Sequence, residues 1–233
     1  MKETDIIEKI RIKIDEKEVL RYLGYPKDIN CESLLNIKQV IKKEIGFTYS
    51  LLNCRGIYQF IKIKSISDDG LVFTSQDFYF SVNRKILDIL HNAEYLMLAV
   101  VTIGSELEDS IQEKFRKNQF SEAVVVDALG TVAVKTAGQW LNHFIEQTYL
   151  QDGLRFTRYF EPGSGDWGLK EQKTIFKVLR PQKIGVTLNS SFMMYPAKSL
   201  SWVRGAGHNL FDSYRDEFSC EYCLLENCRF RKK

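Results

Sequence analysis

The spacing of hydrophobic residues predicts two long helices. In the first, apolar side chains that mark one helix face recur at Leu34, Ile37, Ile41, Ile45 and Tyr49. The second covers residues 121–149, where small residues would let another element pack closely and a bend or interruption is expected near Gly130. A lone histidine inside it, His143, is expected to be a hydrogen-bonded or surface residue and not a ligand.

Three shorter helices are indicated by side chains that can cap their first turn. Asp15 and Glu18 have the spacing of a capping box, and so do Ser105 and Glu108. Asn83 stands in the corresponding place before a third apolar pattern. The helices expected from these caps cover residues 16–23, 106–117 and 84–90.

A hydrophobic period of two predicts short strands between these helices. They are expected at residues 10–14, 58–63, 71–74, 78–80 and 198–203, with a strand-like stretch at 183–188. Residues 95–101 form a continuous apolar run, which is typical of a central strand covered on both faces. The order of these elements predicts one α+β domain over residues 1–233, with a cysteine-rich tail at 219–233.

Charge and composition exclude several classes of function. The formal net charge is only +3, and basic residues alternate with acidic ones, which argues against nucleic-acid binding. The first residues lack the apolar core of a signal peptide, and the longest apolar run is too short to span a bilayer. We therefore expect a cytoplasmic protein without a membrane partner.

Residues with special backbone properties, proline and glycine, are most concentrated in one stretch. It covers residues 158–168, Arg-Tyr-Phe-Glu-Pro-Gly-Ser-Gly-Asp-Trp-Gly. They precede a helix expected over residues 169–179. Arg158 could hold a ligand carboxylate through two parallel hydrogen bonds. Glu161 or Asp166 could lie near a positive centre of the same ligand, and the glycines could offer main-chain hydrogen bonds. The alternative is a purely structural Pro-Gly turn that is capped by the aspartate.

Two other stretches compete with this loop as functional sites. Cys220, Cys223 and Cys228 could converge on a zinc ion or an iron–sulfur cluster; the alternative is a reduced tail. Candidates for a fourth ligand are His208, Cys31 and Cys54. The last predicted strand ends in residues 204–208, Arg-Gly-Ala-Gly-His, but without a third glycine this is a weak dinucleotide-binding fingerprint.

Several motifs along the chain are shared, in the same order, with one known family. They are Glu18–Tyr25, Thr102–Gly104, Asp127–Gly130, Pro162–Trp167 followed by Glu171 and Gln172, Lys183–Val186, Ser191–Ser199 and the final cysteines. In these motifs the chain resembles the activation, or reactivation, domain of cobalamin-dependent methionine synthase in a free-standing form. Each motif alone is weak, but their number and order make the resemblance specific.

The resemblance implies a twisted antiparallel sheet with flanking helices and a site for S-adenosylmethionine on residues 158–166. In that family a corrinoid that has slipped to inactive Co(II) is reduced by a flavodoxin- or ferredoxin-like donor and remethylated from S-adenosylmethionine. The domain contributes proximity and orientation, which agrees with the presence of only three histidines. As an accessory part of a methyltransferase system in methionine biosynthesis, this chain would act on a cobalamin carried by a separate protein.

By matching position, Arg158 would hold the methionine carboxylate, and the main chain of residues 161–165 would contact the nucleoside. The residues concerned in that loop are Glu161, Pro162, Gly163, Ser164, Gly165 and Asp166, with Tyr195 and Lys198 as wall residues. In the family the arginine commonly stands three residues before Pro-Gly, where this chain has Tyr159, and a tyrosine follows where it has Ser164. The alternative hypothesis is an adaptor that docks a corrinoid protein, with a metal-bound cysteine tail and no working S-adenosylmethionine site.

Overall fold

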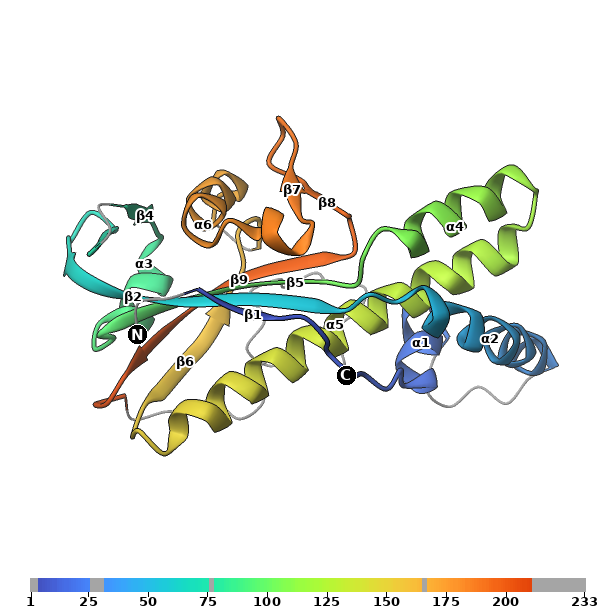
Figure 1. Ribbon diagram of the computed structural model, residues 1–233, viewed down its shortest axis with the longest axis horizontal. Coiled ribbons are helices and arrows are strands. Elements are labelled where there is room, and N and C mark those ends of the chain that lie inside the picture. The colour runs from blue at the N-terminus through green and yellow to red at the C-terminus, as the bar shows by residue number, and fades with distance from the viewer. Residues whose placement is uncertain (1–3, 26–31, 76–77, 165–166, 211–233) are drawn as a thin grey trace.

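A computed structural model gives the architecture of the chain and describes residues 4–25, 32–75, 78–164 and 167–210 (Figure 1). Seven strands form one sheet in the order β4-β3-β2-β5-β9-β6, with β1 beside β2, and every pairing within it is antiparallel. The strands are β1 (Asp5–Ile7), β2 (Arg55–Ile66), β3 (Leu71–Thr74), β4 (Tyr79–Ser81), β5 (Tyr95–Thr102), β6 (Arg155–Phe160) and β9 (Ser199–Gly207). A separate hairpin joins β7 (Thr187–Leu188) and β8 (Met194–Tyr195).

Helices cover both faces of this sheet (Figure 1). They are α1 (Glu16–Tyr22), α2 (Glu32–Leu51), α3 (Arg84–Leu90), α4 (Glu106–Arg116), α5 (Phe120–Leu150) and α6 (Gln172–Leu179), with single 3₁₀ turns at Leu169–Glu171 and Pro181–Ile184. Helix α5 runs along one face and continues beyond the sheet, where α2 and α4 pack against it. Helices α3 and α6 lie on the other face.

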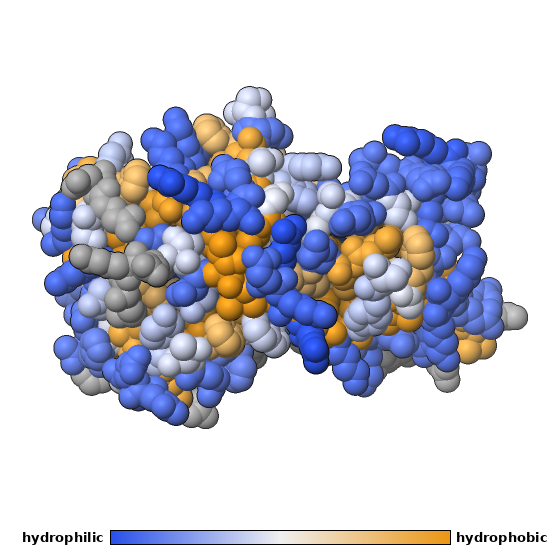
Figure 2. Space-filling view, viewed as in Figure 1, coloured by the Kyte–Doolittle hydropathy of each residue, from blue (hydrophilic) through white to orange (hydrophobic). Residues whose placement is uncertain are grey.

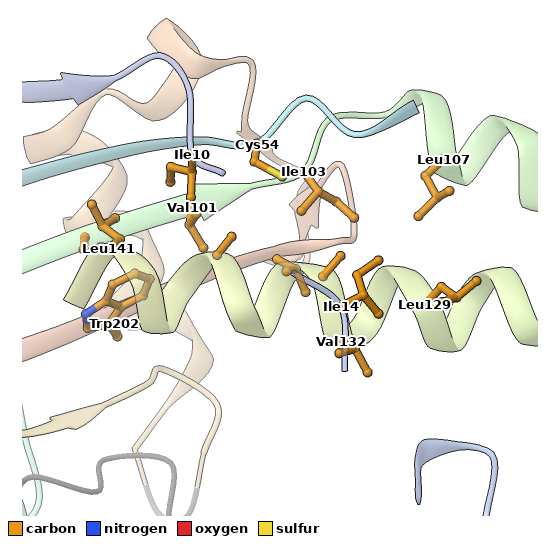
Figure 3. Packing of buried hydrophobic residues seen from close by; sticks show 14 of the residues in the cluster. Ile10, Ile14, Cys54, Val101, Ile103, Leu107, Leu129, Val132, Leu141 and Trp202 are labelled. Carbon is orange, nitrogen blue, oxygen red and sulfur yellow. The ribbon is translucent and has the colours of Figure 1, made fainter. Parts of the chain in front are cut away.

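Strand β5 is the central strand that its apolar run predicts. Its side chains alternate between two buried clusters, one shared with α5 and one shared with α6. Met97, Ala99 and Val101 belong to the first cluster, and Leu98 and Val100 belong to the second. Figure 3 shows the α5-side cluster, in which residues from α5 meet residues from the sheet. Both faces of β5 therefore lie in the core, and the prediction is confirmed.

Helix α5 is continuous through Gly130, so the expected interruption is wrong. A Cβ atom at position 130 would lie 2.6 Å from Cδ2 of Leu107, a residue of α4. Glycine at this position permits close helix packing. One glycine weakens a helix only slightly, and this helix continues without a break over its 31 residues. His143 lies on the exposed side of the same helix, which agrees with a surface role.

Residues 10–14 do not form the strand predicted from their alternation. Ile10 and Ile14 are buried in the α5-side cluster, but their backbone amides donate to the Cys54 carbonyl and to the Tyr49 hydroxyl. The alternation therefore reflects the packing of an extended segment onto the core, and the hydrogen bonds are irregular. The N-terminal strand lies earlier, at Asp5–Ile7.

The expected caps have mixed outcomes. Asp15 accepts a hydrogen bond from the Lys17 amide, and Asn83 accepts one from the Ile86 amide, so both are N-caps. Ser105 makes no such bond, and the capping box predicted there is wrong. Ser105 has a helical backbone with φ −95° and ψ −22°, whereas an N-cap residue is extended, and the Glu108 carboxylate has another role, described below.

The end of the last strand and the strand-like stretch also differ from expectation. Strand β9 continues through Gly207, because Gly205 leaves room for α3 and β6; a Cβ atom there would lie 2.9 Å from Leu90 and 3.0 Å from Thr157. Of residues 183–188 only Thr187–Leu188 is a strand, and a 3₁₀ turn precedes it.

Polar residues cover most of the face seen in Figure 2, and hydrophobic residues gather near the middle of the sheet and among the helices to its right. Within the described ranges, no helix combines the length and the apolar character that crossing a membrane requires. The tail at 219–233 lies outside these ranges, and its status as part of a single domain stays a prediction.

Candidate functional site

The loop after β6 begins with a type II β-turn. Pro162 occupies its second position, Gly163 has φ +85° at its third, and the Ser164 amide donates to the Glu161 carbonyl at 3.1 Å. The Gly163 amide donates to the Trp167 carbonyl at 2.8 Å, and the Trp167 amide donates to Ser164 at 3.3 Å. The described part of the loop is therefore held by its own backbone, and three of its amides are already used.

Trp167 anchors the far side of the loop. It is buried, and its ring lies 5.4 Å from that of Phe160 in an edge-on arrangement. Its indole N–H donates to the Ser81 carbonyl at 2.7 Å, and the Glu171 carboxylate accepts from the Ser81 amide at 3.2 Å. Both backbone groups of one β4 residue thus tie the loop to the sheet.

Arg158 lies in a β-bulge of strand β6. Thr157 and Arg158 together oppose the single residue Gly205, between the pairs that Phe156 and Tyr159 form with β9. The Thr157 hydroxyl accepts from the Gly205 amide at 2.9 Å and donates to the Arg158 carbonyl at 2.8 Å. The bulge fixes the backbone just before the loop and sets the direction in which the half-buried Arg158 leaves the strand.

A buried arginine, the first residue of the 204–208 stretch, supports this bulge. Arg204 is fully buried; its Nε donates to the Thr157 carbonyl at 2.7 Å and its Nη1 lies 2.7 Å from Oε1 of Glu146 on α5. The guanidinium also lies 4.9 Å from the centre of the Phe156 ring. The only sequence signal was an arginine directly after a predicted apolar strand.

Glu161 faces a positive charge that comes from another element. Burial raises the pKa of its carboxyl to about 7, while the Lys135 ammonium on α5 acts in the opposite direction. The Lys135 Nζ lies 5.9 Å from the centre of the Tyr22 ring at the end of α1. The end of β6 therefore combines a carboxyl that titrates near neutrality with a cation and an aromatic ring, and neither of these two was predicted.

Of the two predicted wall residues, Lys198 is bound to a helix and Tyr195 is exposed. The Lys198 ammonium is 2.8 Å from Oδ1 of Asp127 and 2.8 Å from the Thr131 hydroxyl, so it is bound to α5. Its amide donates to Glu108 at 2.9 Å, which explains why that carboxylate does not complete a capping box. Tyr195, in the β7–β8 hairpin, is 54% exposed and available to a ligand or partner.

The remaining predicted ligands are only partly within the described residues. Gly165, Asp166 and the cysteines Cys220, Cys223 and Cys228 lie outside them, as does Cys31. Among the residues that are described, no three His, Cys, Asp or Glu side chains gather in a way that could hold a metal ion. Burial raises the pKa of the Cys54 thiol to about 11, which disfavours the thiolate that binds metals. His208 Nδ1 lies 3.1 Å from the Glu94 carboxylate.

The fold and this loop define a class of α+β domain with an antiparallel sheet, flanking helices and a preformed turn at the end of an edge strand. A crystal structure titled as the MetH reactivation domain bound to AdoHcy has this fold, with a TM-score of 0.70 and 14% sequence identity. The match covers 88% of this chain and 78% of that one. The resemblance to the activation domain is thereby confirmed at the level of the fold. No protein-family model matches the sequence, and a comparison with curated proteins gives no match.

Proposed function

We propose that this protein binds S-adenosylmethionine at residues 158–166 and supports the reductive methylation of an inactive Co(II) corrinoid. The observation that carries the proposal is the fold, because the similar MetH reactivation domain was crystallised with AdoHcy. AdoHcy is the molecule that S-adenosylmethionine becomes once its methyl group has been transferred. The shared motif Pro162–Trp167 coincides with the preformed turn, which supports the same location.

The chemistry of the loop fits a ligand with both signs of charge. The Arg158 guanidinium can pair with the methionine carboxylate, and the Glu161 carboxyl can compensate the positive sulfonium when it is ionised. Because Gly163 and Ser164 donate their amides to the Trp167 and Glu161 carbonyls, main-chain contacts to the nucleoside would come from other groups of residues 161–165. Tyr195 and Lys198 stay predictions as wall residues, and Lys198 would act by holding the β8–β9 connection against α5.

The bound S-adenosylmethionine would supply the methyl group, and the protein would supply its position. A preformed turn lowers the entropy lost when ligand and corrinoid are brought together, which is how positioning alone accelerates a transfer. The corrinoid would belong to a separate methionine synthase or related methyltransferase. A flavodoxin- or ferredoxin-like protein would supply the electron, and the system would operate in the cytoplasm.

One observation favours the alternative adaptor without an S-adenosylmethionine site. The turn already uses two amides, and the nearby cations Arg158 and Lys135 disfavour a ligand with net positive charge. An adaptor would instead depend on its cysteine tail. We expect metal analysis of the purified protein to find zinc or iron under this alternative, and Cys223→Ser to lower the metal content; wild-type protein without metal would contradict it.

The variant that tests the proposal is Arg158→Ala. We expect equilibrium dialysis with labelled S-adenosylmethionine to show at least a tenfold loss of affinity, because a charge-assisted pair contributes about 1.5–3 kcal/mol. Arg155→Ala is the matched control, since Arg155 lies on the same strand and donates to the neighbouring Leu154 carbonyl. Equal affinity of the two variants would contradict the proposed site, and unchanged circular dichroism would exclude unfolding as the cause.

A further inference from the structure

A row of polar residues crosses three strands at one end of the sheet. Arg55 of β2 pairs in register with Thr102 of β5, which in turn pairs with Ser199 of β9. The row lies on the α6 side, because Ile57 and Val100, two residues further along their strands, belong to the α6-side cluster. In Figure 1 this is the end of the sheet from which the chain enters α4, beneath the β7–β8 hairpin.

The two hydroxyls of the row form a buried pair that leaves one donor unused. Ser199 donates to the Thr102 oxygen at 2.9 Å, and the Gly104 amide donates to the same oxygen at 3.2 Å. Thr102 is fully buried and Ser199 is 4% exposed. Only one of the two hydroxyls donates in the bond between them, so one O–H of the pair remains to be donated, and the described residues show no acceptor for it.

Arg55 contributes a further unused donor at the position opposite Thr102. Its Nε is buried without a hydrogen-bond partner, and no ion pair joins it to a described carboxylate. A buried donor without a hydrogen-bond partner costs about 1–3 kcal/mol, and more when the group is charged. We therefore expect an acceptor to bind at this atom. Side chains directly opposite each other in an antiparallel pair lie about 5 Å apart at Cβ, close enough for one acceptor to reach both donors.

The backbone beside Arg55 holds the guanidinium in place. Gly185 has φ +80°, and a Cβ atom there would lie 3.2 Å from Arg55 Nη2. The chain between the second 3₁₀ turn and β7 therefore passes directly against the guanidinium, and a side chain at position 185 would displace it. The Glu106 carboxylate lies beside Gly104, just past the end of β5; its Oε2 is 2.8 Å from the place of a Cβ atom on that glycine.

We propose that Arg55 and Thr102 form a subsite for a small oxyanion, and specifically for a monocarboxylate. The planar fork of the guanidinium matches the two oxygens of a carboxylate, and the Thr102 hydroxyl adds a further donor. One cation balances one negative charge, which favours a monocarboxylate over the dianionic form of phosphate. This subsite lies apart from the β6 loop and does not rest on the function proposed above.

The experiment follows the Arg55 Nε–H resonance of the folded wild-type protein by NMR at constant ionic strength. Acetate, formate and phosphate are titrated separately, and Arg55→Lys assigns the resonance. We expect saturable shifts with acetate and formate at lower concentrations than with phosphate. Thr102→Val should weaken acetate binding about fivefold, which corresponds to one hydrogen bond of roughly 1 kcal/mol. Arg155→Ala is the control and should leave the titration unchanged.

Three results would overturn the proposal. Absence of a saturable shift with every anion would mean that water satisfies both donors. Tighter binding of phosphate would contradict the preference for a monocarboxylate. A large displacement of the resonance in Glu106→Gln without added anion would show that Glu106 is the partner of Arg55 in solution.

Discussion

Arg204 and Arg55 lie on opposite faces of the same sheet and have very different surroundings. Arg204 has an acid, a carbonyl oxygen and an aromatic ring as partners, and these contacts join β9 to α5 and to the bulge of β6. Arg55 has a buried Nε without a partner among the described residues. The comparison indicates that the first arginine joins elements of the fold, whereas the second has a buried donor that no described residue uses.

The largest expected effect is on the free energy of unfolding, and it distinguishes the role of Arg204 from that of Arg55. Arg204→Met should lower the free energy of unfolding by about 3 kcal/mol, because Glu146 and the Thr157 carbonyl both lose a partner. Arg55→Met, the matched change, should alter it by less than about 1 kcal/mol, since the Arg55 Nε has no hydrogen-bond partner among the described residues. Urea unfolding followed by circular dichroism measures both. Equal losses would show that Arg55 is as structural as Arg204.

A second prediction concerns the charge at the end of β6. The Glu161 pKa rises from 4.5 in the unfolded chain to about 7 in the fold, so the folded state binds more protons between these values. The free energy of unfolding should therefore fall as pH rises from about 4.5 to about 7 and stay level above.

Glu161→Gln should remove this pH dependence. At pH 8 the variant should be more stable than wild type by about 3 kcal/mol, and at pH 4 the two should be equal. Glu8→Gln, at an exposed position, is the control and should follow wild type. Urea unfolding at several pH values tests this prediction. If the free energy of unfolding depended on pH in the same way for Glu161→Gln and wild type, the Glu161 carboxyl would be well solvated.

A smaller effect is expected at the turn that precedes the proposed ligand contacts. Gly163→Ala should cost about 1 kcal/mol, because φ is +85° and a Cβ atom would lie 3.0 Å from Leu169. Gly168→Ala should be nearly neutral, since φ there is −64° and the nearest atom is 3.7 Å away. Thermal unfolding of the two variants compares them. Equal melting temperatures would show that the turn tolerates another conformation.

Much of the fold could be predicted from local sequence. The caps at Asp15 and Asn83 and the apolar run of β5 are local signals, and the structure confirms them. Residues 10–14 show the limit, because alternation records which side chains face the core and not whether the backbone joins a ladder. Gly130 shows the same limit, since a glycine that admits a neighbouring helix resembles one that ends a helix.

The candidate site was less predictable than the fold. The turn at 161–164 follows from Pro162 and Gly163, whose backbone preferences are local. Lys135, Tyr22 and Arg204 reach the same region from α5, α1 and β9, and no short-range pattern records that these elements meet. Long-range proximity of this kind depends on how the helices pack on the sheet.

The most direct test of the proposed function is calorimetric titration of the wild-type protein with S-adenosylmethionine, with S-adenosylhomocysteine in parallel. We expect saturable heat with one site per chain for both ligands, and we expect Arg158→Ala to abolish it while Arg55→Lys leaves it intact. Absence of heat and of any thermal shift at millimolar ligand would contradict the account and leave the adaptor as the function to pursue.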